Sequence, residues 1–498
     1  MSDYDYDGRN NDERAEMSPS DRVWRTNESC MLASAARVGI DRNGRPFSFV
    51  PGYFEILTTD YRAVRRMLEA AGATVVTFQA DSGSTDDTGT PRGPVAPARE
   101  LTPIQAHAAL ANELGVTVME LDPSVDVVAL IHRVRRRLPE VQIAPIHVNL
   151  TASYSGAPAW DGTPAWDGTP AWDGTGRGPS CGCGSSKSCG CAPRRCGCVG
   201  RCVCVRPRRC MNPRTLTDLR IRRWSSAEPT SDPGPSVLLG NSGPNPNPVT
   251  IAVLDTGLFP GFVDPRITVR GGGDDDTDSD GDRVLDTDAG HGTFVTGIIR
   301  RLAPEAEIVS TRVLDSFGVG NDATLLAGLR ALMTAPVPDI INLSLGAYTM
   351  DDAGGLSVRL QLEQLMDLGI TIVAAAGNDA TSRPFYPAAL PGVISVGALG
   401  PNGPARFTNR GSWVDACATG VDVVSRFATF TEELPFGRRA FNGWARWSGT
   451  SFAAPRVAAA IARRRALTGR TVDEVVADLI YASDIVRIPC LGAMVNVL

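Results

Sequence analysis

The chain has 498 residues, too many for one ordinary domain and enough for two or three. Its formal net charge of -6 at pH 7 gives no reason to expect nucleic acid or an anionic membrane as a partner of the whole molecule. The sequence contains no run of about 18 apolar residues, so we expect no membrane span. The acidic start Met1–Asp7 lacks the basic-then-apolar pattern of a secretory signal, so we expect a cytoplasmic protein unless another route exports it.

The first 150 residues divide into a tail and a small domain. Residues 1–46 are polar and turn-rich, which predicts disorder. Residues 47–150 show the order strand-helix-strand twice, with a further helix near 101–114. The strands are expected at Tyr53–Thr58, Ala73–Phe78, Val116–Leu121 and Val141–Leu150, and the helices at Asp60–Ala71 and Val125–Leu138. This order is typical of a small α+β ferredoxin-like domain.

Residues 151–248 have the composition of a linker. The hexapeptide Pro-Ala-Trp-Asp-Gly-Thr occurs three times between Pro158 and Thr175, and nine of the twelve cysteines fall between Cys181 and Cys210. Such a segment cannot bury a core, so we predict a disordered Cys-rich linker. The cysteines leave two alternatives: they bind a thiophilic metal ion such as zinc, or they are free thiols in a basic low-complexity tract.

Residues 249–498 alternate apolar strands with helices. Continuous apolar strands are expected at Ile308–Val313, Ile340–Leu345, Thr371–Ala376 and Val393–Ala398. Helical stretches lie near Ala323–Met333 and Leu356–Leu368. Strands without polar alternation, separated by helices, predict a doubly wound parallel α/β sheet with both faces covered.

Three short strings in this region each present one member of an Asp/His/Ser triad. Asp255 ends an apolar strand, His291 lies between two glycines ahead of an apolar helix, and Ser451 precedes an Ala-rich helix. Proline is tolerated only in the first helical turn, so Pro455 predicts that this helix begins near Ser451. A serine hydroxyl is a weak nucleophile that needs a histidine to accept its proton and a carboxylate to orient that histidine.

A fourth residue, Asn378, follows the strand Thr371–Ala376 and could donate its amide to a tetrahedral oxyanion. Together the strings around Asp255, His291, Asn378 and Ser451 resemble the signature blocks of the subtilisin-like serine proteases, over roughly Val249 to Ser483. The resemblance implies a serine endopeptidase in which Asp255 orients the histidine, His291 is the general base, Ser451 is the nucleophile and Asn378 completes the oxyanion hole.

The resemblance also implies substrate-binding segments. Ser344, Leu345 and Gly346 match the segment that pairs with extended protein or peptide substrate, and the run ending in Ala375, Ala376 and Gly377 matches a wall of the P1 pocket. Phe294 stands where the family usually has a second histidine, a position not needed for proton transfer. The chemistry requires no cofactor. The alternative is a catalytically silent binding module that keeps the fold.

An acidic run before His291 has alternating carboxylates at Asp276, Asp278, Asp280 and Asp282. This spacing is that of the beginning of a calcium-binding loop, but the glutamate of an EF-hand is replaced by Thr287. Calcium binding and a solvated acidic loop are therefore both open.

The domain at 47–150 is topologically similar to a subtilase propeptide, which implies a zymogen inhibited by its own N-terminal domain. We expect the segment Thr151–Gly156 to reach Ser451 as a product-like tail, with processing between this domain and Val249. An unrelated adaptor domain is the alternative.

Overall fold

The computed structural model describes residues 36–77, 101–159 and 248–496, apart from 272–274, 276–277, 280, 282, 335 and 435–436. The calcium candidates Asp276, Asp280 and Asp282, and the whole Cys-rich tract, therefore lie outside the described residues.

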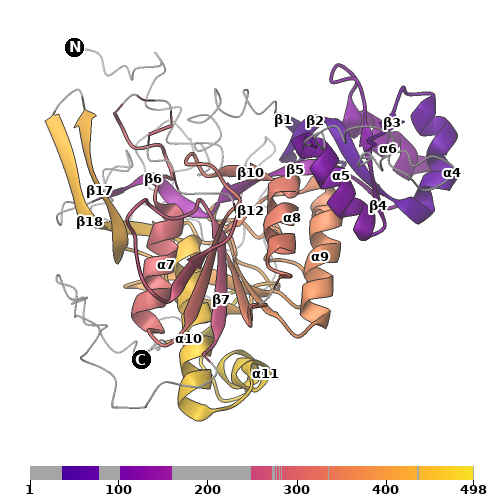
Figure 1. Ribbon diagram of the computed structural model, residues 1–498. Helices are drawn as coiled ribbons and strands as arrows, with labels where there is room; N and C mark the ends of the chain where they lie inside the picture. Colours follow the sequence, from indigo (N-terminus) through magenta and orange to yellow (C-terminus); the bar gives the residue numbers. More distant parts are fainter. Residues whose placement is uncertain are drawn as a thin grey trace, which may run out of the picture. The chain divides into compact units, whose positions relative to one another are not determined.

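The C-terminal half is organised around a sheet whose central strands are parallel, which confirms the predicted doubly wound arrangement (Figure 1). The spatial order is β8-β9-β7-β11-β13-β14-β16-β20-β19, with β15 (Gly403–Pro404) paired to β14. These strands are β7 (Thr250–Asp255), β8 (Ile267–Val269), β9 (Glu307–Arg312), β11 (Ile340–Leu343), β13 (Thr371–Ala375), β14 (Ile394–Gly400), β16 (Ala416–Thr419), β19 (Arg487–Ile488) and β20 (Gly492–Met494). The chain runs from β7 to β9 on one side and then to β11 on the other, so the strand order reverses beside β7, where α/β folds bind ligands.

Helices cover both faces of this sheet (Figure 1). On one face lie α7 (His291–Leu302) and α10 (Thr450–Thr468), and on the other α8 (Asp322–Ala331) and α9 (Leu356–Asp367). Each pair buries its apolar side chains in its own cluster with the sheet residues of that face. The smaller α11 (Val472–Val476), η3 (Ala477–Tyr481) and η2 (Met350–Asp352) follow or connect these elements.

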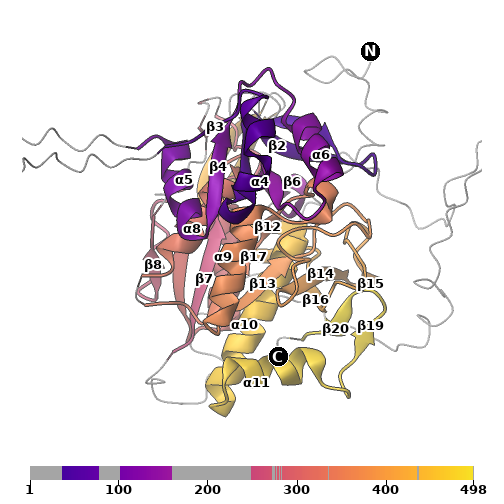
Figure 2. The same ribbon diagram turned by 90° about the vertical axis from the view of Figure 1, so that its right-hand side faces the viewer.

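The described residues 36–77 and 101–152 form an antiparallel sheet with three helices, and we call this part the N-terminal module. Its strand order is β5-β2-β4-β3, and β1 pairs with β2. The elements are β1 (Arg37–Ile40), β2 (Pro46–Leu57), α4 (Thr58–Glu69), β3 (Thr74–Val75), α5 (Pro103–Glu113), β4 (Val116–Glu120), α6 (Val127–Arg137) and β5 (Ile143–Thr151). Figure 2 shows α4 and α6 beside the strands, and their apolar residues share a cluster with Phe54 and Met119.

The expectation that disorder extends to residue 46 is wrong at its end, because β1 occupies Arg37–Ile40. Val38 and Ile40 are about half exposed (49% and 54%), so β1 carries no core pattern and is held by its pairing with β2.

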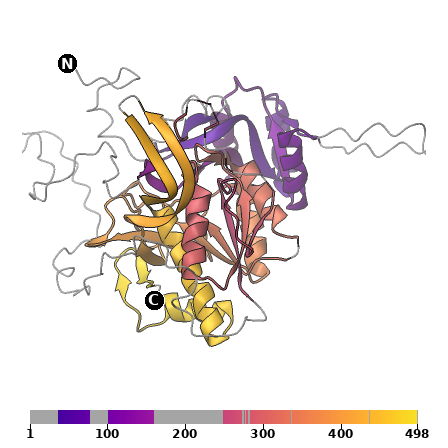
Figure 3. The same ribbon diagram turned by 60° about the vertical axis from the view of Figure 1, so that its left-hand side comes forward.

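Another three-stranded sheet consists of β6 (Ser153–Ala159) and the long hairpin β17 (Val423–Leu434) and β18 (Gly437–Gly449). Strand β17 contacts α7 (Figure 3). Strand β6 falls within the segment predicted to be a linker, so the linker's first residues are extended and paired. Among the described helices, none is both long enough and apolar enough to cross a bilayer.

Candidate functional site

Asp255 and His291 meet at the carboxyl end of β7. Asp255 is the last residue of β7 and His291 the first of α7, and the Nδ1 atom of His291 lies 2.7 Å from Oδ1 of Asp255. Both side chains are completely buried. The backbone N–H of Thr256 donates to the same Asp255 oxygen at 2.8 Å. The contact with Asp255 uses only Nδ1 of His291. The other ring nitrogen, Nε2, has no hydrogen-bond partner among the described residues and can accept a proton.

The environment of His291 favours its charged form. Burial alone would lower the pKa of His291, but the charge of the Asp255 carboxylate and its hydrogen bond outweigh burial and raise the pKa above 6.5. Asp288 and Asp275 add smaller contributions in the same direction. An imidazolium that forms during a reaction would therefore be stabilised here.

Asp275 ties together the two loops that carry this pair, a role the sequence pattern did not reveal. Its Oδ2 atom accepts hydrogen bonds from the Thr256 hydroxyl at 2.8 Å and from the Gly290 N–H at 2.6 Å. These donors adjoin Asp255 and His291 in the chain. Burial raises the pKa of Asp275 to about 7.

Ser451 lies in the first turn of α10, as the position of Pro455 predicted. It is fully buried, and its hydroxyl donates to the carbonyl oxygen of Ser344 at 3.0 Å. In return, the Ser344 hydroxyl donates to the carbonyl oxygen of Ser451 at 2.8 Å. The serine hydroxyl is therefore bonded to Ser344, and Nε2 of His291 has no hydrogen-bond partner among the described residues.

Asn378 and Ser451 converge on one carbonyl oxygen, that of Ala152. The side-chain amide of Asn378 donates to it at short range, and the backbone N–H of Ser451 donates at 3.1 Å. Thr450 orients the amide, because its N–H and hydroxyl donate to Asn378 Oδ1 at 3.0 and 2.9 Å. Two donors on one carbonyl oxygen beside a serine form the arrangement that stabilises an oxyanion in acyl transfer.

The segment leading to Ala152 lies in the site as an additional strand. Strand β5 pairs antiparallel with β12 (Leu345–Gly346) on one side and with β10 (Val319–Asn321) on the other. The N–H of Ala152 donates to the Ser344 carbonyl oxygen at 3.0 Å. The structure thus brings the predicted Thr151–Gly156 segment to Ser451 at Ala152.

The predicted substrate-binding residues separate into two groups. Ser344, Leu345 and Gly346 contact β5. Ala375 and Ala376 are completely buried in hydrophobic clusters. Gly377 donates its N–H to the Thr450 hydroxyl at 3.1 Å and so supports the residue that orients Asn378.

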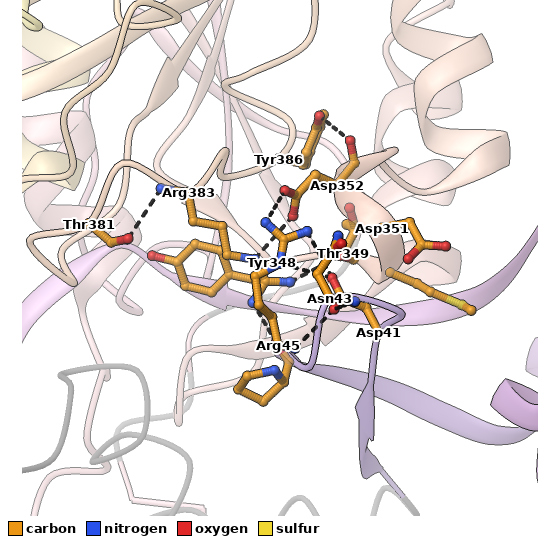
Figure 4. Close-up of polar contacts among 12 residues, drawn as sticks. Asp41, Asn43, Arg45, Tyr348, Thr349, Asp351, Asp352, Thr381, Arg383 and Tyr386 are labelled. Atoms are coloured by element: carbon orange, nitrogen blue, oxygen red, sulfur yellow. Dashed lines mark hydrogen bonds and ion pairs between the residues drawn. The ribbon is translucent and has the colours of Figure 1, made fainter. Parts of the chain in front are cut away.

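The N-terminal module is joined to the rest of the chain by polar contacts on the loop 348–352 (Figure 4). Arg45, in the turn between β1 and β2, contacts Asp352 at 2.5 Å and its neighbour Asp41 at 2.9 Å. Arg383 holds Asp352 from the other side at 3.1 Å and donates to the Pro46 carbonyl oxygen at 2.6 Å (Figure 4). Asp352 is therefore contacted by two arginines: Arg45 of the N-terminal module and Arg383 of the C-terminal half.

A second contact is buried. Glu55 of β2, fully buried, accepts hydrogen bonds from the N–H of Ser357 at 2.9 Å and from its hydroxyl at 2.5 Å. Ser357 lies in the first turn of α9, whose N-terminal end favours a negative charge. His107 of α5 contacts the same carboxylate at 2.8 Å.

The acidic run is described only in part. Asp278 accepts a hydrogen bond from the Arg283 N–H at 3.0 Å. Over the ranges that the structure describes, no three histidine, cysteine or acidic side chains gather closely enough to hold a metal ion. Calcium binding stays a prediction.

Comparison with known proteins relates residues 247–483 to one family. A family model described as "Subtilase family" matches residues 247–483. Subtilisin E of Bacillus subtilis (strain 168) is 33% identical over 237 residues, which cover 45% of this chain and 56% of that protein. Subtilisin of Bacillus pumilus is 33% identical over 237 residues and is covered to 78%. A solved structure of proteases from Pseudoalteromonas arctica has 24% identity, a TM-score of 0.41, and coverage of 50% of this chain and 88% of that chain. The match thus spans about half the length of Subtilisin E.

Proposed function

The chain belongs to the subtilase family, and from this premise we propose that it is a serine endopeptidase acting through Asp255, His291 and Ser451. One observation carries the proposal. The side-chain amide of Asn378 and the backbone N–H of Ser451 both donate hydrogen bonds to the carbonyl oxygen of Ala152. This contact supports the proposal, because a substrate carbonyl oxygen would need the same two donors to be stabilised as an oxyanion.

The proposed reaction begins when the Ser451 hydroxyl turns from Ser344 toward His291. His291 Nε2 accepts the hydroxyl proton while Oγ bonds to the carbonyl carbon, and Asp255 holds the imidazole through Nδ1. The carbonyl oxygen becomes an oxyanion stabilised by Asn378 and the Ser451 N–H. The C–N bond then breaks, the leaving amine takes the proton from His291, and water hydrolyses the resulting acyl-enzyme by the same path.

We further propose that the chain is a zymogen that cleaves itself between Ala152 and Ser153. Strand β5 ends at Thr151 on one side of this bond, and β6 begins at Ser153 and pairs with β18 on the other. The peptide bond between them is thus presented in an extended chain, the form that proteases recognise. The N-terminal module, with the strand order of a ferredoxin-like domain, would remain as an inhibitor through β5, Glu55 and Arg45.

Intact mass spectrometry tests processing and activity together. Incubated wild-type protein should release a fragment ending at Ala152, whereas Ser451→Ala should stay full length. A fluorophosphonate probe should label Ser451 in the wild type and nothing in the variant. A wild-type chain that remains whole yet active would show that the module is an adaptor. A chain that is neither cleaved nor labelled would support the silent binding module instead.

A further inference from the structure

The Asp322 carboxylate lies beside β5 and is 3% exposed. Its Oδ2 atom accepts hydrogen bonds from the N–H of His147 at 2.8 Å and from the Nδ1 atom of the same residue at 3.0 Å. Its Oδ1 atom accepts from the side-chain amide of Asn149 at 3.0 Å. Within the described part of the chain, β5 therefore supplies every hydrogen bond that this carboxylate accepts.

The two partner residues lie on the same face of β5. Alternate residues of a strand point to the same side, so Asn149 and His147 both face Asp322. His147 is fixed as a donor through Nδ1, because its Nε2 accepts the N–H of Met350 at 3.2 Å. The contact therefore has two parts: a backbone hydrogen bond that any substrate could supply, and side-chain hydrogen bonds that depend on sequence.

The surroundings of Asp322 accommodate a buried carboxylate. Asp322 is the first residue of α8, and the N-terminal end of a helix stabilises negative charge. Gly355 leaves room for the carboxylate, because a Cβ atom at Gly355 would lie 2.6 Å from Asp322 Oδ2. The start of α8 and Gly355 thus provide a favourable position and room for the carboxylate, and β5 provides its hydrogen bonds.

We infer that Asp322 selects substrates that carry a hydrogen-bond donor or a cation at the fourth residue before the cleaved bond. The inference rests on the proposed function and takes Ala152 as the residue before that bond, so that Asn149 is the fourth. An ionised carboxylate only accepts hydrogen bonds. An apolar side chain at this position would leave Oδ1 of Asp322 without its hydrogen bond, and an acidic side chain would repel the carboxylate. A lysine or arginine would form a charge-assisted pair instead.

The test uses internally quenched peptides that copy residues 146–156 and differ only at the position of Asn149. One peptide keeps Asn at this position, and the other three carry the changes Asn149→Lys, Asn149→Leu and Asn149→Asp. They are assayed with self-processed wild-type protein, and the concentration of active serine is determined by titrating a separate aliquot with the fluorophosphonate probe. The value of kcat/KM for the Asn149→Lys peptide should exceed that for Asn149→Leu by about tenfold or more, with Asn149→Asp lowest.

The full-length variant Asp322→Asn supplies the reciprocal measurement. Its side chain both donates and accepts, so the advantage of the Asn149→Lys peptide should disappear and the Asn149→Asp peptide should improve. The matched control Asp473→Asn removes an exposed carboxylate on α11 and should keep the wild-type order. Equal kcat/KM for all four peptides, with a wild-type enzyme of which a separate aliquot is labelled by the probe, would overturn the selectivity and leave the endopeptidase standing. Absence of both labelling and cleavage would overturn both.

Discussion

The side-chain amide of Asn378 donates a hydrogen bond to the carbonyl oxygen of Ala152, which lies 226 residues earlier in the chain. Replacing the amide by an apolar group of similar size, in Asn378→Leu, removes one of the two donors to the developing oxyanion. We expect kcat to fall by about 10²–10³, the loss known for such a donor in subtilisin, with little change in KM. Steady-state kinetics on a peptide amide checks this, and an equal rise in KM would instead indicate a role in ground-state binding.

Thr450 acts through Asn378, so its loss should have a milder effect. Thr450→Val removes the hydroxyl that donates to Asn378 Oδ1 and accepts from Gly377, but it keeps the side-chain volume. We expect kcat to fall by about tenfold, the equivalent of one ordinary hydrogen bond. Thr450→Ser keeps the hydroxyl and should restore most of the rate. If Thr450→Ser were as impaired as Thr450→Val, the methyl group rather than the hydrogen bonds would be responsible.

The pH profile should report His291. The base must be neutral to accept a proton, so kcat/KM falls as the pH drops through the pKa of His291. That pKa is raised above 6.5 by the Asp255 carboxylate against the effect of burial, so the midpoint should lie above 6.5. Asp255→Asn removes the charge that raises it. We expect a lower midpoint and a loss of about 10⁴ in kcat, as for other triads. A wild-type midpoint below 6.5 would contradict this assignment.

Glu55 should control how long the N-terminal module stays bound after processing. Glu55→Ala leaves the N–H and the hydroxyl of Ser357, on the other side of the contact, without their acceptor, at a cost of about 1–3 kcal/mol in docking. The lag before peptide cleavage should therefore shorten while the final rate stays the same. The control Glu69→Ala changes an exposed carboxylate paired with Arg65 at the end of α4. Equal lags in both variants would argue against a docking role for Glu55.

The sequence predicted where the candidate triad residues lie in the fold better than it predicted the residues that surround them. Asp255, His291 and Ser451 stand in short strings at strand and helix ends, where local pattern is enough to place them. Ala375 and Ala376 are buried, and their place in a pocket wall stays a prediction that rests on the resemblance. No local pattern marks Asp322, because its partner His147 lies 175 residues away in the chain.

The bond proposed for cleavage and the serine that attacks it belong to one polypeptide, because Ala152 lies in the site through the pairing of β5 with β10 and β12. Collision with a second molecule is then unnecessary, and processing should follow first-order kinetics. The half-time of processing should stay constant when the protein is diluted. The rate at which the released enzyme cleaves a separate peptide would instead fall in proportion as the enzyme is diluted. A chain with Ser451→Ala, mixed with a trace of wild type, should consequently persist intact long after the wild type has matured.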